Sequence, residues 1–371
     1  MVLHVFGKMD KGGAESRSIE MLRHIDPERV HSIYCTTSGS TEPGALDQEI
    51  KALGGEVIPC PLGKGFAGRF RNLLKEKGVT AMHGHVHFVS GLLCLYAAQA
   101  GVPVRIVHWH TTELDKRPFR KRTQDKALAV LIDKYATDIV AVGRAAMTKS
   151  WPSYEGDKRC TILYTGIDKK RFDPALSPPK TRAELGLPED ALVFAQVGRF
   201  DPIKNQLFGV RIFAEILKQE PNARLIFLGK GGNEYEAQVK QEAKNLGVEN
   251  KISYMGLVKD VANYLPLANL TLLPSLFEGL PGVALESFAS GVPVLGSDLV
   301  TTREIQESLL GCELLSLQDP PEKWAEAAIH LARKYAPSEK RNELREALFA
   351  SHFNLEKCVQ GHIEVWSGKA H

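Results

Sequence analysis

Two glutamates, Glu278 and Glu286, flank a stretch of the sequence that predicts a strand-to-helix turn. The apolar run 270–273 has the length of a buried strand, and Pro281 and Gly291 stand where the following helix would begin and end. The unpaired N–H groups and the positive dipole end of a helix start attract a pyrophosphate. Glu278 can accept hydrogen bonds from sugar hydroxyls, and Glu286 can hold a ribose diol. The stretch therefore favours a grip on a sugar nucleotide over the alternative of two solvated surface glutamates.

The surroundings of Glu278 strengthen this interpretation. Gly279, Pro281 and Gly282 follow it closely, and the run 291–297 predicts the next buried parallel strand. The glutamates would then lie at the carboxyl edge of a sheet, which is where ligands bind in open α/β folds.

Two cations, Arg199 and Lys204, also follow a predicted strand and precede a predicted helix. A guanidinium binds a diphosphate in a fork and an ammonium binds it as a point charge. Together they would stabilise the charge on a departing nucleoside diphosphate. Asn205 is expected to cap the helix that follows. The alternative is a solvated pair in a loop, and the glutamate stretch favours the diphosphate interpretation.

A turn containing Gly12 and Gly13 follows the first predicted strand and opens a helix. Glycine lets backbone approach a ligand closely, although a pair of glycines alone more often marks a tight turn. The turn lacks the Gly-x-Gly-x-x-Gly pattern of a dinucleotide-binding dehydrogenase, which argues against that class of enzyme.

Histidines cluster at the ends of two predicted strands, in the segments 83–87 and 108–110. Alternation would place the three histidines of 83–87 on one face, and His-x-His is also a spacing of metal ligands in hydrolases. The aspartate and further histidine ligands of such a site are not evident at later strand ends. We therefore favour a role in a cleft, where His110, with Thr111 and Thr112 beside it, touches a transferred sugar or steadies charge near the reacting carbon.

Basic residues crowd the stretch 116–122, which includes Phe119, and Arg69 and Arg71 flank Phe70. A solvated loop is the simplest interpretation of each patch. Because both patches fall in the first half of the chain, we hypothesise a surface for an anionic acceptor or for anionic lipid headgroups.

The composition sets the remaining bounds. The chain has 371 residues, of which 43% are apolar and 25% charged, enough for two domains with separate cores. Six scattered cysteines lack Cys-x-x-Cys spacing, so we expect a reducing cytoplasm, no disulfides and no zinc site. No stretch has the apolar length that crosses a bilayer, which leaves the inner face of the cell membrane as the hypothesis for any membrane association. A net charge of +3 without a recognition motif argues against nucleic acid as a partner.

Short β-rich runs alternate with amphipathic helical stretches, which is typical of parallel sheets covered by helices on both faces. The first series of strands is expected at 2–7, 31–37, 56–60, 81–85, 104–110, 138–143 and 160–164. The second is expected at 192–197, 224–229, 251–254, 270–274, 292–297 and 312–316. We therefore predict an α/β protein with an N-terminal Rossmann-like domain (1–170), a linker (171–190), a C-terminal Rossmann-like domain (191–352) and a final helix (353–371) that crosses back.

Several of these motifs together resemble one enzyme family. They are Gly12 to Glu15, His110, Gly198 to Phe200 with Lys204, Phe227 to Gly231, Glu278 to Pro281 with Glu286, and Gly291 to Val294. This set resembles the retaining glycosyltransferases of the GT-B fold, family 4, in particular enzymes of bacterial exopolysaccharide, capsule and lipopolysaccharide assembly. The likeness runs through nearly the whole chain and is strongest from Ala191 to Glu304.

The resemblance implies a GT-B fold with two sheets facing across a cleft, and a role for each matching residue. Arg199 and Lys204 would contact the donor diphosphate, with Glu278 on the donor sugar. Glu286 would hold the ribose, Val258 would lie near the base, and His110 would be the histidine of the cleft. The other substrate-binding positions would be Gly12, Gly13, Gly229, Gly279, Leu280 and Pro281.

Two stretches depart from the family's pattern. Thr165 stands where the family usually has asparagine before Gly-Ile-Asp, and Val300, Thr301 and Thr302 replace a glycine pair before Glu304. Both departures bear on loop conformation and on the choice of acceptor or donor.

The function expected from the sequence is retaining transfer of a hexosyl or N-acetylhexosaminyl residue from a nucleoside diphosphate sugar, with a UDP-sugar favoured, to a hydroxyl of a glycan or lipid-linked acceptor. No Asp-x-Asp pattern is present to hold a divalent cation on the donor, so neither a metal nor another cofactor is expected. One alternative is a sugar-nucleotide 2-epimerase of similar architecture, and another is a non-catalytic nucleotide-sugar sensor.

Overall fold

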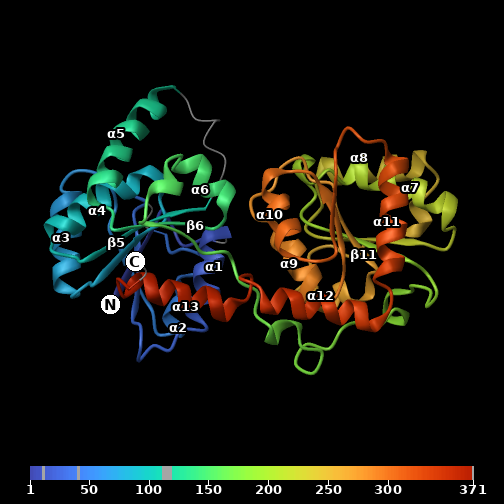
Figure 1. Cartoon of the computed structure of the whole chain (residues 1–371), viewed down its shortest axis with the longest axis horizontal. Helices are drawn as coiled ribbons and strands as arrows, with labels where there is room; N and C mark the ends of the chain where they lie inside the picture. The colour runs from blue at the N-terminus through green and yellow to red at the C-terminus, as the bar shows by residue number, and fades with distance from the viewer. Residues whose placement is uncertain (11–12, 40–41, 111–118, 370–371) are drawn as a thin grey trace. The chain divides into compact units, whose positions relative to one another are not determined.

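The computed structural model describes residues 1–10, 13–39, 42–110 and 119–369, with only the backbone described at 119–122. The chain divides into two compact units, shown in Figure 1. The first unit comprises Met1–Thr165 and Leu355–His371, and the second comprises Gly166–Asn354. Within the described ranges, no helix has both the length and the apolar character to cross a membrane.

The first unit is built on a seven-stranded parallel sheet in the order β3-β2-β1-β4-β5-β6-β7. Its strands are β1 (Val2–Phe6), β2 (Ser32–Thr36), β3 (Glu56–Pro59), β4 (Ala81–Gly84), β5 (Val104–Trp109), β6 (Asp138–Ala141) and β7 (Cys160–Ile162). All seven strands predicted from the apolar runs are confirmed, each one or two residues shorter than its run.

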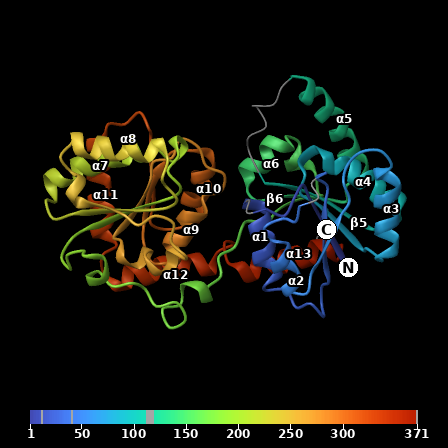
Figure 2. The same cartoon turned by 180° about the vertical axis from the view of Figure 1, so that it is seen from behind.

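Helices cover both faces of this sheet (Figures 1 and 2). One face carries α1 (Gly13–Leu22), α2 (Asp47–Ala52) and α13 (Leu355–Trp366), and the other carries α3 (Phe66–Glu76), α4 (Ser90–Gln99), α5 (Phe119–Tyr135) and α6 (Arg144–Ser150). Strand alternation decides what each face receives. Leu3 and Val5 of β1 point into the core beneath α3 to α6, whereas Phe6 points to the face of α1 and α2.

The second unit has a six-stranded parallel sheet in the order β10-β9-β8-β11-β12-β13. Its strands are β8 (Val193–Val197), β9 (Arg224–Leu228), β10 (Ile252–Tyr254), β11 (Leu270–Leu273), β12 (Val294–Ser297) and β13 (Cys312–Leu315). All six predicted strands are again confirmed. One face carries α7 (Gln206–Gln219), α8 (Glu234–Asn245) and α11 (Pro321–Lys334), and the other carries α9 (Gly282–Ala289), α10 (Val300–Ser308) and α12 (Ser338–Ala350) (Figures 1 and 2).

The segment between β7 and β8 contains three prolines within 174–179 and packs on the second unit. The Lys180 amide donates to the Asn263 carbonyl (2.7 Å), and the Asn263 amide donates to the Ser177 hydroxyl (3.0 Å) and the Pro178 carbonyl (2.9 Å). These contacts hold the segment along the loop that follows β10.

Each sheet has one point where the strand order reverses. In the first sheet this point lies between β1 and β4, and in the second between β8 and β11. In open α/β sheets, ligands bind outside the carboxyl ends of the strands at such a point. A binding site is therefore expected at the loops that follow these four strands.

Candidate functional site

The loops after β8 and β11 are tied together at the reversal point of the second sheet. The Leu276 amide donates to the Ile203 carbonyl (2.8 Å), and the Asn205 side chain donates to the Pro274 carbonyl (3.0 Å). Asn205 does stand before α7, but the prediction of a side-chain cap is wrong. Its backbone adopts a left-handed conformation (φ 54°), and its amide serves the neighbouring loop instead.

Lys204 and Glu278, both predicted as site residues, form an ion pair across these two loops. The Lys204 ammonium donates to Oε1 (2.7 Å) and Oε2 (3.0 Å) of Glu278, whose side chain is only 8% exposed. The Ser275 hydroxyl donates to the same Oε1 (2.6 Å), and the Thr301 hydroxyl donates to the Glu278 carbonyl (3.1 Å). A buried carboxylate is stable here because its charge is paired and hydrogen-bonded.

Thr301 and Thr302, which stand where the family has a glycine pair, support the loop that carries Glu278. Thr301 holds the Glu278 backbone, and the Thr302 hydroxyl accepts from the Leu299 amide (2.9 Å) and donates to the Ser297 carbonyl (2.6 Å). The two threonines therefore fix the start of α10 and the loop before α9 at once.

Arg199, the other predicted diphosphate ligand, lies apart from the ion pair. Its side chain is 67% exposed, and its Nε donates to Asp201 (2.9 Å). The Ile203 amide and then Arg199 lower the pKa of Asp201, which is therefore a carboxylate at neutral pH. The exposed guanidinium is accessible to an anionic ligand.

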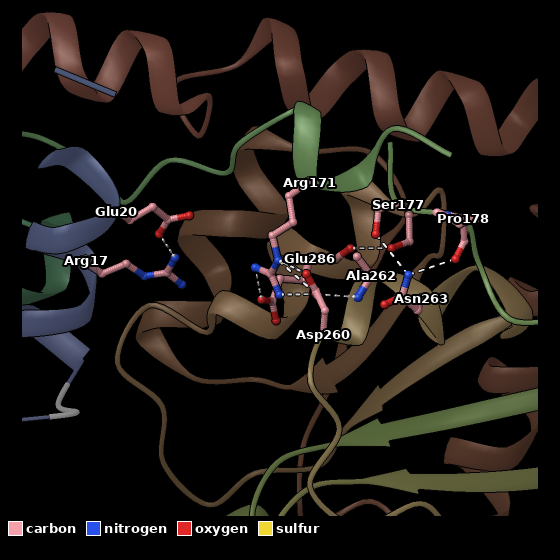
Figure 3. Close-up of polar contacts among 10 residues, drawn as sticks. Arg17, Glu20, Arg171, Ser177, Pro178, Asp260, Ala262, Asn263 and Glu286 are labelled. Atoms are coloured by element: carbon pink, nitrogen blue, oxygen red, sulfur yellow. Dashed lines mark hydrogen bonds and ion pairs between the residues drawn. The ribbon is translucent and has the colours of Figure 1, made fainter. Parts of the chain in front are cut away.

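Glu286, on α9, contacts a residue that sequence reasoning missed (Figure 3). Arg171 donates from Nη1 to Oε1 of Glu286 (2.9 Å) and from Nε and Nη2 to the carboxylate of Asp260 (2.7–3.0 Å). Burial alone would raise the pKa of Asp260, but the bonds from Arg171 and from the Ala262 amide outweigh burial and lower it. No local pattern marks Arg171, because its partners are 89 and 115 residues away in the sequence.

Replacement of Arg171 by alanine should destabilise the second unit. It would leave two half-buried carboxylates, Asp260 and Glu286, without their cation, which we expect to lower the free energy of unfolding by about 2 kcal/mol. Urea denaturation measures this loss. The matched control is Arg303→Ala, because Arg303 pairs with Asp298 on the exposed surface and should matter little. Equal free energies of unfolding in the two variants would contradict the role of Arg171 in stabilising Asp260 and Glu286.

The predicted glycine positions differ in their surroundings. A Cβ on Gly229 would lie 2.0 Å from the Gly198 carbonyl, so close packing of the loops after β8 and β9 already requires glycine there. A Cβ on Gly13 or Gly279 would meet nothing within 4 Å, so both backbones border open space. Gly12 lies outside the described residues.

Three further positions predicted to bind substrate lie in loops of the second unit, two between β11 and α9 and one after β10. Leu280 is half-buried, and Pro281 stands directly before α9 at its N-cap. Val258 is half-buried and packs on the core of the unit.

The first unit gathers the two histidine motifs on one face of its sheet. His83 Nε2 lies 3.0 Å from His108 Nδ1, and His85 Nδ1 lies 2.8 Å from His110 Nε2. The two pairs lie against each other: the rings of His108 and His110 stack with centroids 4.0 Å apart, and those of His83 and His85 are tilted with centroids 4.1 Å apart. The expected common face does not extend to His87, because β4 ends at Gly84 and His87 lies in a short 3-10 helix.

Two more histidines join this cluster. His4 of β1 pairs in register with His83, and the ring of His362 on α13 lies near that of His108, with centroids 5.7 Å apart. Sequence reasoning missed both; the alternation of β1 could have indicated His4, which stands on the same face as Phe6.

The clustered imidazoles are neutral at physiological pH. Burial is the main cause: it lowers the pKa of His110 and of His4 to about 3 and that of His362 to about 4. Burial likewise holds the pKa values of His83, His85 and His108 well below the ordinary value. A neutral His110 favours hydrogen bonding to a hydroxyl over carrying charge beside a reacting carbon. Thr111 and Thr112, predicted beside it, lie outside the described residues.

Among the described residues, two trios of histidines bring ring nitrogens within 4.8 Å of one another, the proximity that the metal-binding alternative requires. They are His4, His83 and His85, and His85, His108 and His110. In each trio a pair of nitrogens already shares a hydrogen bond, at 3.3 Å between His4 and His85 and at 2.8 Å between His85 and His110. A cation would have to replace those bonds.

Of the two basic patches, the stretch 116–122 lies outside the described side chains. Phe70 is fully buried in the core, so the second patch consists of Arg69 and Arg71 alone. Arg69 donates to the Lys64 and Pro61 carbonyls (both 2.8 Å), and Arg71 donates to Gln99 (2.6 Å). These hydrogen-bond partners are uncharged, so none of them offsets the positive charge of the patch.

Comparison with known proteins shows which class of protein has a similar sequence and fold. The family described as Glycosyl transferases group 1 matches residues 191–334. EpsF of Bacillus subtilis, provisionally named a glycosyltransferase, is 30% identical over 99% of this chain and 96% of its own. The capsular polysaccharide biosynthesis glycosyltransferase CapH of Staphylococcus aureus is 28% identical over 87% of this chain and 88% of its own. The solved structure of Anabaena HepE in complex with UDP superposes with a TM-score of 0.82 at 17% identity, covering 99% of both chains.

Two Rossmann-like units with these topologies, and their similarity to HepE, define the GT-B fold. The chain belongs to the group 1 glycosyltransferases.

Proposed function

We propose that this glycosyltransferase moves a hexosyl or N-acetylhexosaminyl residue from a UDP-sugar to a hydroxyl of a glycan or lipid-linked acceptor. The observation that carries the proposal is the Lys204–Glu278 pair at the reversal point of the second sheet. It presents a cation for a diphosphate beside a carboxylate for sugar hydroxyls, at the edge where α/β folds bind ligands. Support for uridine comes from HepE, which was solved with UDP, and support for a glycan product comes from the name of CapH.

In this proposal the transfer retains the anomeric configuration and needs no metal. Lys204 and the exposed Arg199 meet the charge that develops on the departing diphosphate, which is the role a divalent cation would otherwise fill. Glu278 accepts from hydroxyls of the transferred sugar, and Glu286 accepts from the ribose. The acceptor hydroxyl attacks on the face from which the diphosphate leaves, and its proton passes to the leaving phosphate.

The first unit supplies the acceptor side in this account. His110 is a neutral hydrogen-bonding group for the transferred sugar, and Gly13, where a side chain would enter open space, lets the backbone approach the donor phosphate. Arg69 and Arg71 belong to the basic surface proposed for an anionic acceptor or membrane.

The test is release of nucleoside diphosphate by the purified full chain. A panel of UDP- and GDP-sugars is incubated with and without glycan and lipid-diphosphate-linked acceptors, and the product anomer is read by NMR. We expect UDP release that depends on the acceptor, with an anomer matching that of the donor. Isomerisation of the sugar without an acceptor would instead indicate an epimerase, and donor binding without turnover on any acceptor would indicate a sensor. Either result would contradict the proposal.

A further inference from the structure

Behind His110 the hydrogen-bonded chain continues through His85 to a third imidazole. His85 Nδ1 lies 2.8 Å from His110 Nε2, and His85 Nε2 lies 3.3 Å from His4 Nδ1. His85 and His4 are buried, and His85 stacks face to face on Phe6, with centroids 4.1 Å apart and ring planes 6° apart. Packing therefore fixes the plane of the ring that contacts His110.

Because His85 hydrogen-bonds to both His4 and His110, the tautomers of these two neighbours depend on each other. A neutral imidazole has one N–H and one bare nitrogen, so His85 donates to one neighbour and accepts from the other. If His85 donates from Nδ1, then His110 Nε2 is bare and its hydrogen lies on Nδ1. If His85 accepts at Nδ1, then the hydrogen of His110 lies on Nε2 and its Nδ1 is a bare acceptor. The state of His85 thus decides whether the remaining nitrogen of His110 is a donor or an acceptor.

The hydrogen-bonded pair of His83 and His108 behaves differently, because the indole of Trp366, which can only donate, fixes the tautomers of both rings. The Trp366 indole N–H donates to His83 Nδ1 (3.0 Å), so the hydrogen of His83 lies on Nε2 and is donated to His108 Nδ1 (3.0 Å). The hydrogen of His108 therefore lies on its Nε2, and this series of hydrogen bonds does not include His110. In the described part of the chain, no donor-only group hydrogen-bonds to His4, His85 or His110.

We propose that His85 is a positioning residue for His110: it holds the ring in place and dictates the tautomer that His110 offers to the transferred sugar. His4 supports His85 from behind. The inference rests on the proposed function, because it takes His110 to contact the substrate. A histidine held in the wrong tautomer loses catalytic effectiveness even when its position is kept, which is why a buried partner on its second nitrogen matters.

The experiment compares three variants of the full chain with the wild type. His85→Phe keeps the ring stacked on Phe6 but removes both hydrogen bonds, and we expect kcat to fall at least about tenfold, the scale found when a partner that orients a histidine is lost. His85→Asn places an amide near the position of Nδ1 and should restore much of the rate. His83→Phe is the matched control, since His83 is also buried, lies two residues before His85 at the end of β4, and hydrogen-bonds to His108 instead of His110. Its kcat, corrected for the folded fraction, should be that of the wild type.

A spectroscopic measurement separates positioning from stability. In 15N-histidine-labelled protein, the tautomer populations of His110 should be the same in the wild type and in His83→Phe, and should be different in His85→Phe. The inference is overturned if His85→Phe keeps the wild-type tautomer and kcat, if His83→Phe loses as much activity, or if His85→Asn restores nothing. His110→Ala separates this inference from the proposed function. Normal transfer by that variant would contradict the proposed role of His110 itself, whereas its loss alongside a normal His85→Phe would contradict only the role of His85.

Discussion

Replacement of Glu278 by glutamine is expected to abolish glycosyl transfer, with kcat/KM lower by at least about 100-fold. Glutamine keeps the shape of the side chain and can still accept from Ser275, but it removes the charge that orients Lys204 and weakens acceptance from sugar hydroxyls. Lys204→Ala should have an effect of similar size, because it removes the cation that faces the leaving diphosphate and leaves Glu278 buried without its partner. Initial rates of nucleoside diphosphate release at saturating acceptor measure both losses.

The chain offers a matched control for this experiment. Lys77 contacts both carboxylate oxygens of Glu56 (2.8 and 2.7 Å) in the first unit, and we assign neither residue a role in the site. Glu56→Gln removes a Lys–Glu pair of the same kind and should leave transfer unchanged. Circular dichroism should show the native fold in all three variants. A folded Glu278→Gln enzyme with near-normal turnover would remove this glutamate from the mechanism.

Acidification is expected to unfold the first unit below about pH 5.5, ahead of the second. A buried histidine whose folded pKa lies below its unfolded value takes up its proton more readily in the unfolded chain, so stability is full above the ordinary pKa of 6.5 and falls as the pH drops below it. The loss stops growing once the pH passes the folded pKa, about 3 for His4 and about 4 for His362. At pH 5 each of these two histidines costs about 2 kcal/mol, and His83, His85 and His108 add to the loss in the same direction.

Circular dichroism between pH 8 and pH 4 measures this transition, and short digestion with pepsin followed by mass spectrometry identifies the unit that opens. The control is His362→Leu, which removes one buried imidazole at the surface between α13 and the sheet and should move the midpoint to lower pH. Simultaneous unfolding of both units, with a midpoint unaffected by His362→Leu, would contradict a histidine-driven transition.

The fold was largely predictable because the signals for it are local. Every strand lies within one of the apolar runs from which it was predicted. The prediction of a helix start near Pro281 is confirmed by α9, which begins at Gly282. The ends of the strands were predicted less accurately. Strand β4 ends at Gly84, so His87 lies beyond it in a short 3-10 helix, and no residue type in that segment predicts the turn. Membership of the glycosyltransferase family also followed from local motifs.

Contacts within the site were only partly predictable, because they depend on which strands are neighbours. Lys204 and Glu278 were each expected at a strand end, but their direct pairing requires β8 to lie beside β11, an order that periodicity cannot give. The same applies to the two histidine motifs, which meet because β4 lies beside β5. Arg171 shows the limit most clearly, since it stands in a segment interpreted as a linker and acquires its partners only in the folded unit.

Binding of UDP to the second sheet's reversal point is the most direct test of this account. Isothermal titration of the full chain with UDP should show one site per chain, weakened at least about tenfold by Lys204→Ala and unchanged by Glu56→Gln, because an ammonium that faces the diphosphate contributes at least about 1.4 kcal/mol. Absence of UDP binding by the wild-type chain, or equal affinity in Lys204→Ala, would contradict it.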